Sequence, residues 1–142
     1  MTRGWTVLLI GCVALVGCGD DTPTAPSGPN FPIPEFQIID VFVGSGQEAT
    51  TGRRLFVSYE GWLYDPNSSD FKGELFDRND DFQFVLGDDD IIPGWNQGLV
   101  GIRVGGLRRL IIPPELAFGD SGAGSVPPDW PVVFEVRLTV II

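Results

Sequence analysis

The sequence contains no histidine, and this absence excludes several classes of chemistry. Histidine is the commonest general base in enzymes, the central member of serine-histidine triads and a frequent ligand of zinc. The chain therefore has no such triad, no histidine base and none of the common histidine-containing zinc sites. A function that needs none of these groups is favoured.

Basic residues are also scarce. The 142 residues include 9 Lys and Arg against 19 Asp and Glu, so the formal net charge at pH 7 is −10. Proteins that bind nucleic acid need a basic surface to neutralise phosphates. We therefore expect no nucleic-acid partner. The length fits one domain with an appended segment.

The chain has two cysteines, both near its N-terminus. One positive charge followed by an apolar run over 5–16 is typical of a signal peptide and too short to span a bilayer. The sequence LVGC at 15–18 resembles a bacterial lipoprotein signal, in which the cysteine becomes the acylated first residue. We predict that residues 1–17 are removed with Cys12 and that Cys18 is lipidated. Alternatively, an ordinary signal peptide is cut nearby and Cys18 stays free.

This interpretation places the protein in the bacterial cell envelope, anchored by lipid to a membrane and facing outside the cytoplasm. With Cys12 removed and Cys18 lipidated, no disulfide can form, so the domain must be stable through its core alone. Residues 18–35 are rich in proline and small polar residues, which predicts a flexible tether. The folded domain is expected over 36–142.

Alternation of apolar and polar residues, most clearly over 54–64 and 132–142, and extended segments bounded by Gly, Pro or polar turns predict the strands of this domain. The longer ones are expected over 37–43, 54–64, 107–112 and 132–142, with shorter extended segments over 75–77 and 82–87, and a flexible loop over 119–124.

One short helix is expected between these strands. Trp95, Leu99 and Ile102 recur at i, i+4 and i+7, with Pro93 at the start and Gly101 at the end. A helix of this length needs an apolar surface to lie on. We therefore predict an α+β domain in which one sheet of antiparallel-looking strands folds over the helix.

The charged and glycine-rich motifs do not indicate a cofactor. Residues 77–81 imitate the start of a calcium loop, but Phe82 replaces the glycine required at position six. We interpret this run, and the aspartates at 88–90, as solvated acids on turns. The glycines of 98–106 follow a helix instead of preceding one, unlike a phosphate loop. A glycosidase-type carboxylate pair is neither selected nor excluded by spacing. We predict no metal and no cofactor.

Aromatic residues are more informative, because they fall on nearly every predicted element. A core is the simplest interpretation, but the order of the surrounding segments indicates more. In order along 36–142, the segments VSYEGWL (57–63), LFD (75–77), FQFVLG (82–87), IIPGWNQGL (91–99), VGGLRRLIIPPELAFG (104–119) and VPPDWPVVFEVRL (126–138) resemble the signature segments of the FKBP-type, macrolide-binding peptidyl-prolyl isomerases. The resemblance implies a strongly twisted, mostly antiparallel sheet wrapped around one short α-helix, with a hydrophobic pocket between them.

The resemblance also implies roles for individual residues. Trp95 would form the pocket floor beneath a proline ring, Asp77 would face the isomerising amide, and the backbone N–H of Ile92 would hold a substrate carbonyl. Phe118 would stand where the family usually has a tyrosine, and the catalytic residues would be Asp77, Tyr59 and Phe118. The remaining pocket residues would be Tyr59, Phe82, Ile91 and Phe134, with Phe76 beside them and Val126 on the loop over the mouth; Phe84 is either pocket or plain core.

Several positions depart from the family pattern. Phe118 keeps the aromatic ring but lacks the usual hydroxyl. Arg78 and Asn79 replace serines, Ser125 replaces an aliphatic residue, and Trp130 is unusual. These changes bear on efficiency and ligand affinity more than on the fold.

We predict a peptidyl-prolyl cis-trans isomerase that assists the folding of exported proteins. It would bind proline-containing polypeptides, and macrolide inhibitors, as a monomer. No nucleophile, metal or proton relay is needed, because a dry aromatic pocket can favour the twisted amide. One alternative is a low-turnover proline-peptide-binding chaperone with the same pocket, and a weaker one is a purely structural envelope lipoprotein.

Overall fold

A computed structural model describes residues 28–142 of the chain. The predicted signal peptide, Cys12, Cys18 and the first part of the predicted tether lie outside the described residues. Within residues 28–142, no helix is both long and apolar enough to cross a membrane.

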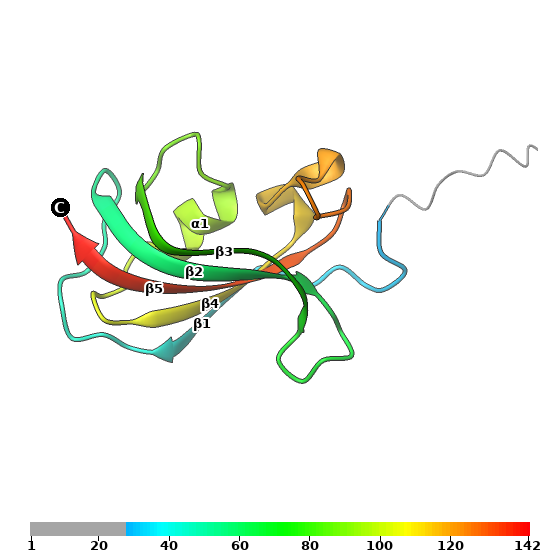
Figure 1. The fold of residues 1–142 in the computed structure, drawn as a ribbon, viewed down its shortest axis with the longest axis horizontal. Helices are drawn as coiled ribbons and strands as arrows, with labels where there is room; N and C mark the ends of the chain where they lie inside the picture. Colours follow the sequence, from blue (N-terminus) through cyan, green and yellow to red (C-terminus); the bar gives the residue numbers. More distant parts are fainter. Residues whose placement is uncertain (1–27) are drawn as a thin grey trace, which may run out of the picture.

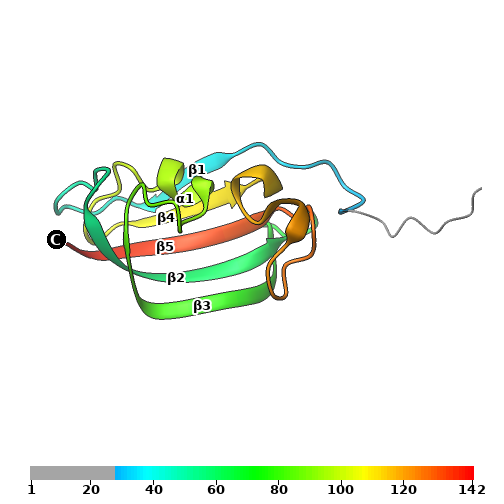
Figure 2. The same cartoon turned by 90° about the horizontal axis from the view of Figure 1, so that it is seen from above.

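The domain is one five-stranded antiparallel sheet with one short α-helix, so the predicted α+β fold is confirmed. The strands lie in the order β1-β4-β5-β2-β3 (Figure 2). The sheet curves beneath the helix α1 (Figure 1). The bounds are β1 Gln37–Phe42, β2 Arg54–Tyr64, β3 Lys72–Val85, α1 Pro93–Gly98, β4 Leu107–Ile112 and β5 Val132–Ile141, with 3-10 helices η1 Pro114–Leu116 and η2 Gly119–Ser121 between β4 and β5. The bounds of β2 and β4 are those predicted from the sequence, from alternation for β2 and from the flanking Gly and Pro residues for β4.

The main core lies between the sheet and α1. Leu110 of β4 pairs with Phe134 of β5, and Ile112 pairs with Val132, so all four side chains point to the same face. Each of them is at least 97% buried. A Cβ on Gly98 would lie 2.7 Å from Leu110 Cδ2, so only glycine allows α1 to lie this close to β4.

The helix is shorter than its apolar stripe predicted. It ends at Gly98 rather than near Gly101, which adopts a φ of +87°. Leu99 and Ile102 are nevertheless buried in the core, because a further turn follows in which the Ile102 N–H donates to Leu99 O. The spacing of Trp95, Leu99 and Ile102 thus predicted correctly that all three are buried, but only Trp95 lies in the helix.

The alternation predicted for β5 fails at its C-terminal end. The alternation over 132–142 puts Val140 on the same face as Val136 and Leu138, which are buried in the core, yet Val140 is 47% exposed. The register explains this: Leu138 pairs with Val57 and Val140 with Phe56, so Thr139 forms a bulge. One extra residue reverses the faces that follow it. Ile141 therefore packs against the core instead.

The acidic run 77–81 lies within β3, so the predicted turn was wrong, although its aspartates are exposed to solvent as predicted. The two predicted extended segments are joined into one strand of 14 residues. Asn79 pairs with Tyr59 and Phe82 with Val57, which leaves one extra residue on β3 as a bulge. The Asn79 side chain accepts a hydrogen bond from the Asp81 N–H at 2.9 Å and supports this bulge.

The segment 119–124, predicted to be a flexible loop, contains the 3-10 helix η2 and a bridge between Ala123 and Val126.

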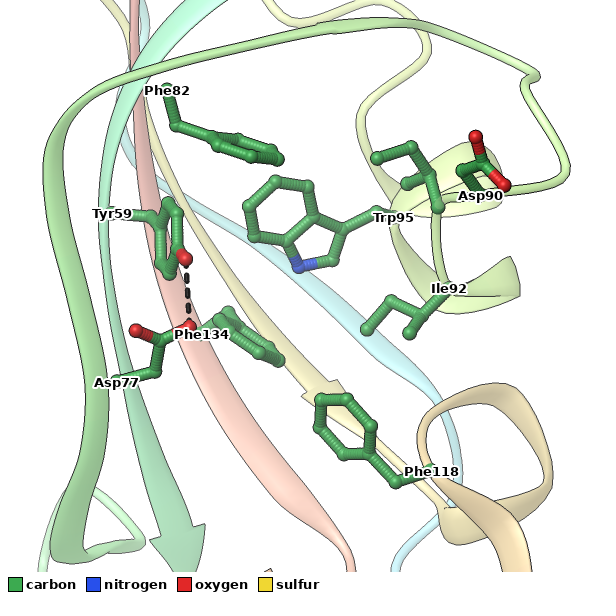
Figure 3. A pocket seen from close by; sticks show the side chains of 9 residues that line it. Tyr59, Asp77, Phe82, Asp90, Ile92, Trp95, Phe118 and Phe134 are labelled. Atoms are coloured by element: carbon green, nitrogen blue, oxygen red, sulfur yellow. Dashed lines mark hydrogen bonds between the residues drawn. The ribbon is translucent and has the colours of Figure 1, made fainter. Parts of the chain in front are cut away.

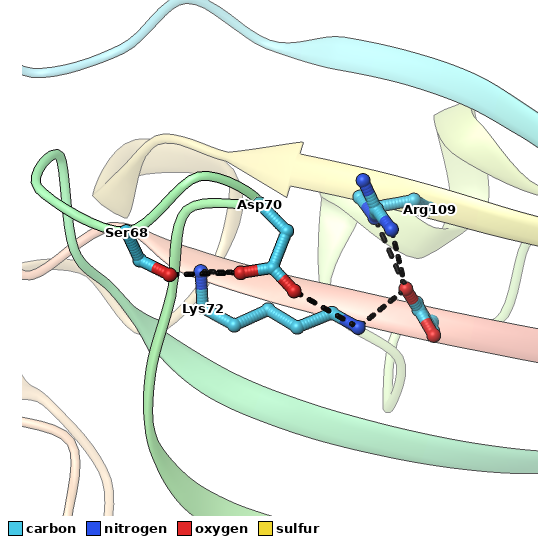
Figure 4. Close-up of polar contacts among 5 residues, drawn as sticks. Ser68, Asp70, Lys72 and Arg109 are labelled. Carbon is cyan, nitrogen blue, oxygen red and sulfur yellow. Dashed lines mark hydrogen bonds and ion pairs between the residues drawn. The ribbon is translucent and has the colours of Figure 1, made fainter.

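A second cluster of side chains packs on the opposite face of the sheet, where Ile111 pairs with Val133. We call it the far-face cluster: Phe31, Ile39, Trp62, Tyr64, Phe71, Ile111 and Val133. Next to it, Glu135 Oε1 accepts from Lys72 Nζ at 2.7 Å and from Arg109 Nη2 at 2.9 Å (Figure 4). Burial alone would raise the pKa of Glu135, but these two cations lower it below its ordinary value.

Candidate active site

A cavity of about 160 Å³ opens between the concave face of the sheet and α1. Side chains from β2, β3, β5, the start of α1 and the segment after η1 point towards it (Figure 3). The lining residues are Tyr59, Asp77, Phe82, Asp90, Ile91, Ile92, Trp95, Phe118 and Phe134. The cavity is therefore mainly aromatic and aliphatic, with two carboxylates and one phenol at its edge.

Trp95 is the centre of this aromatic arrangement. Its ring centroid lies 5.0 Å from that of Tyr59, 5.3 Å from that of Phe134 and 6.0 Å from that of Phe82, each at a steep angle. Such edge-to-face contacts are favourable and fix the orientation of the indole. Although Trp95 is only 4% exposed, its Nε1 has no hydrogen-bond partner among the described residues. A buried donor without an acceptor is rare in proteins and marks this position as unusual.

Tyr59 and Asp77 form the polar edge of the cavity. The Tyr59 hydroxyl donates to Asp77 Oδ2 at 2.7 Å, and the Arg78 N–H donates to Oδ1 at 2.8 Å, so both carboxylate oxygens are held (Figure 3). Burial, the hydrogen bond to Asp77 and the charge of that carboxylate all raise the pKa of Tyr59 above its ordinary value. Tyr59 is therefore a neutral donor throughout the physiological pH range.

The segment from Asp90 to Ile92 borders the cavity at the start of α1. Asn96 fixes the residues just before this segment: its Oδ1 accepts from the Gly87 N–H at 2.8 Å, and its Nδ2 donates to Asp88 O at 2.9 Å. None of the hydrogen bonds found among residues 28–142 uses the Ile92 N–H. This amide is therefore available for a ligand at the edge of the cavity.

Phe118 forms the wall opposite Tyr59, between η1 and η2 (Figure 3). Behind it, the Phe76 ring packs edge-on against Phe118 and Phe134, with centroids 5.9 and 5.5 Å apart. A Cβ on Gly61 would lie 2.7 Å from the Phe134 ring and 2.9 Å from the Phe76 ring. Glycine at position 61 thus leaves space for the two rings that support the pocket wall.

The structure brings most of the predicted site residues together. Eight of them line the cavity: Tyr59, Asp77, Phe82, Ile91, Ile92, Trp95, Phe118 and Phe134. Phe76 lies behind the wall rather than in the lining. Val126 also lies outside the lining; it is 3% exposed, packs in the core, and forms a bridge with Ala123.

Two residues of the site were not identified from the sequence. Asp90 lines the cavity, and Asn96 holds the segment that carries it. The position of Asp90 immediately before Ile91 was the one signal for it, but the run of three aspartates had been interpreted as a solvated turn. Phe84, left open between pocket and core, is 7% exposed and packs on Trp95 outside the lining. Among residues 28–142, no group of three or more potential metal ligands is arranged to hold an ion.

Comparison with known proteins identifies the family of this chain. Residues 45–139, more than half of the chain, match the family model of FKBP-type peptidyl-prolyl cis-trans isomerases. An FK506-binding protein of Neisseria meningitidis serogroup B is 41% identical over 102 residues, which cover 71% of this chain and 91% of the relative. The chain belongs to the FKBP-type peptidyl-prolyl cis-trans isomerases.

Solved structures of this family share the fold. A peptidyl-prolyl cis-trans isomerase from Pseudomonas syringae pv. tomato aligns with a TM-score of 0.63 at 31% identity, covering 75% of this chain and 74% of its own. The crystal structure of AtFKBP13 aligns with a TM-score of 0.64, also at 31% identity, covering 75% and 93% of the two chains. The predicted family and fold are confirmed.

Proposed function

We propose that the cavity above Trp95 is where this protein binds proline and isomerises the preceding peptide bond. The observation that carries the proposal is the enclosure of an open cavity by five aromatic side chains, with the Tyr59–Asp77 pair at one edge and a free Ile92 N–H at the other. An apolar ring of a substrate fits the aromatic part. The flanking amides lie within reach of the polar edge.

The chemistry needs no covalent intermediate. Rotation about a peptide bond faces a barrier of roughly 18–20 kcal/mol, because resonance gives the bond double-bond character. The twisted amide has less charge separation than the planar one, so a pocket with few polar groups favours it. The Ile92 N–H holds one substrate carbonyl while Asp77, fixed by Tyr59, faces the rotating amide. Each 1.36 kcal/mol of preference for the twisted form raises the rate about tenfold.

The same pocket is proposed to bind FK506-type macrolides as well as proline-containing polypeptides. A relative that is 41% identical is named for its binding of FK506. The aromatic lining of the cavity here supports the proposal, because macrolide ligands of this type present a large apolar surface. Phe118 contributes a ring to the wall but no hydroxyl donor, so one polar contact to such a ligand is absent.

The substrates are proposed to be exported proteins, which the enzyme would bind at the surface of a membrane of the bacterial cell envelope. The support is the apolar run over 5–16, whose end overlaps the sequence LVGC at 15–18, which predicts acylation of Cys18. Labelling with a radioactive fatty acid tests this: wild type should incorporate label and Cys18→Ser should not. Label in both variants, or in neither, would contradict the anchor.

The missing hydroxyl at Phe118 favours one alternative, a binding module with little turnover. The two functions are separated by measuring cis-trans exchange of a proline peptide with catalytic amounts of the protein. We expect acceleration by wild type, inhibition by FK506, and a large loss in Asp77→Ala. Saturable binding of the peptide without faster isomerisation would leave only the binding module. Absence of both binding and faster isomerisation would contradict both functions.

A further inference from the structure

The chain before β1 is in contact with the loop that connects η2 to β5. The Phe31 ring packs edge-on against Trp130, with centroids 5.4 Å apart and planes at 89°, and lies 5.6 Å from the Tyr64 ring. A Cβ on Gly28 would lie 3.3 Å from the Asp129 Cβ, so the backbone there also runs against this loop. Figure 2 shows the start of the described chain, in blue, beside the orange loop.

Trp130 connects this contact to the sheet. Its Nε1 donates to Tyr64 O at 3.3 Å, and the Tyr64 N–H donates to Pro131 O at 3.0 Å. Trp130 is half-buried against the main core, whereas Phe31 and Tyr64 belong to the far-face cluster. The indole therefore lies where the two clusters meet, at the point where the loop enters β5.

The other end of the same loop reaches the cavity. The Asp129 N–H donates to Gly119 O at 2.8 Å, and Gly119 directly follows Phe118, which lines the cavity. Asp129 has a φ of +56°, in the left-handed region that aspartate adopts more readily than most residues other than glycine. The chain therefore turns sharply just before Trp130. The segment at 28–31 contacts the loop at this turn, through Gly28 against Asp129 and Phe31 against Trp130.

Phe31 also lies outside the part of the chain that matches the family model, which begins at residue 45. Its contact with Trp130 is therefore a property of this chain's N-terminal segment added to the family domain. Trp130 itself is one of the residues that depart from the family pattern.

We propose that Phe31 is a positioning residue for the pocket. By packing on Trp130 it holds the loop from 119 to 131, which in turn keeps Phe118 at the cavity wall. The segment before the domain thereby sets substrate affinity without touching substrate. This inference rests on the proposed function of the cavity, because Phe118 matters only if substrate binds there.

The test is Phe31→Ala in the full chain. If the loop then holds Phe118 at the wall for only a third to a tenth of the time, the apparent affinity falls by the same factor. We expect KM for a proline peptide to rise about three- to tenfold while kcat stays within about twofold. Backbone amides of 119–131, Asp129 foremost, should exchange with deuterium faster than in wild type.

Two further variants separate positioning from loss of stability. Phe31→Tyr keeps the ring and should restore both KM and slow exchange. Phe71→Ala removes the ring stacked on Tyr64 at 5.4 Å, within the same cluster but without contact to Trp130. It should lower the melting temperature and leave both KM and exchange in 119–131 as in wild type.

Unchanged deuterium exchange and unchanged KM in Phe31→Ala, or an equal rise of KM in Phe71→Ala, would overturn the proposal. So would a Phe31→Ala chain that no longer folds, because Phe31, which also packs on Tyr64 of β2, would then be required by the core and would not act mainly on the loop. Exchange is measured without substrate, so an inactive wild type would contradict the proposed function while leaving the loop contact to be judged separately.

Discussion

Two groups of aromatic rings lie on opposite faces of one sheet, and they differ in what they leave open. Around Trp95 the rings enclose a cavity, and the indole Nε1 has no acceptor among the described residues. In the far-face cluster Tyr64 stacks on Phe71 at 5.4 Å, and the adjoining Trp130 Nε1 donates to Tyr64 O. The first group has an opening and an unused donor, and the second packs ring against ring.

The comparison shows that aromatic content does not by itself define a site. Buried rings stabilise a fold in either place, because they remove a large apolar area from water. A binding site is indicated where the rings leave a cavity between them and a buried polar group has no hydrogen-bond partner. We therefore expect substitutions around Trp95 to reduce activity and equivalent substitutions in the far-face cluster, other than at Phe31, to reduce stability alone.

The largest effect is expected from Trp95→Ala. Removing a buried indole should lower the free energy of unfolding by about 3–5 kcal/mol. It should also reduce kcat/KM at least about 100-fold, since the pocket floor is lost. Trp62→Ala is the matched control: it removes an indole from the far face and should leave kcat/KM within about twofold. Urea denaturation and an isomerisation assay measure both quantities, and equal losses of activity in the two variants would contradict the comparison.

Glu135→Gln should affect stability and leave activity within about twofold. It removes the charge that Lys72 and Arg109 share, which should cost about 1–3 kcal/mol at pH 7. The pKa of Glu135 is lowered in the folded state, so its stabilisation is present above the ordinary value of 4.5 and is lost as pH falls through the folded value. Urea denaturation at pH 7 and pH 3 checks this. A difference from wild type that persists undiminished at pH 3 would show that the charge is not the cause.

A smaller effect is expected from Tyr59→Phe, which removes the hydroxyl that fixes Asp77. We expect kcat/KM to fall about tenfold, equivalent to about 1.4 kcal/mol, because Asp77 is no longer oriented. The free energy of unfolding should change by no more than about 1 kcal/mol. Tyr64→Phe removes the corresponding hydroxyl from the far face and should leave kcat/KM unchanged. If both variants lose activity alike, the hydroxyl–carboxylate contact has no special role.

No effect of pH on activity is expected between about pH 6 and pH 9. The chain has no histidine, and the pKa of Tyr59 is raised above its ordinary value of 10.0. Because the folded-state pKa is the higher one, Tyr59 stabilises the fold below pH 10.0, and this contribution is lost at more alkaline pH. A pH profile of kcat/KM should therefore be flat. A bell-shaped profile centred near neutrality would indicate an acid–base step that the proposed mechanism does not contain.

Much of this arrangement could be predicted from the sequence, for identifiable reasons. Alternation predicted β2 with its bounds, and the Gly105-Gly106 turn and the Pro113-Pro114 pair predicted those of β4, because such residues end strands. The order of the family segments assigned Trp95, Tyr59 and Asp77 to one pocket although they lie far apart in the chain. The structure places all three around one cavity.

Other features depend on contacts that a periodic pattern does not reveal. The bulge at Thr139 reverses which side chains of β5 face the core after that residue. A second bulge, in β3, lies within the acidic run and allows that run to continue the strand. Asp90 reaches the cavity because Asn96 fixes the connection before α1. Phe31 lies in a proline-rich segment whose composition predicts a tether, and its partners Tyr64 and Trp130 are distant in sequence.

The proposed pocket is tested most directly by NMR, in which the indole N–H resonances are recorded while a proline peptide is added to the protein. We predict that the Trp95 N–H signal shifts saturably while the signals of Trp62 and Trp130 do not move. We also predict that exchange between the cis and trans peptide signals becomes faster at a catalytic concentration of the protein. Shifts confined to Trp62 or Trp130, or saturation of Trp95 with no faster exchange, would contradict it.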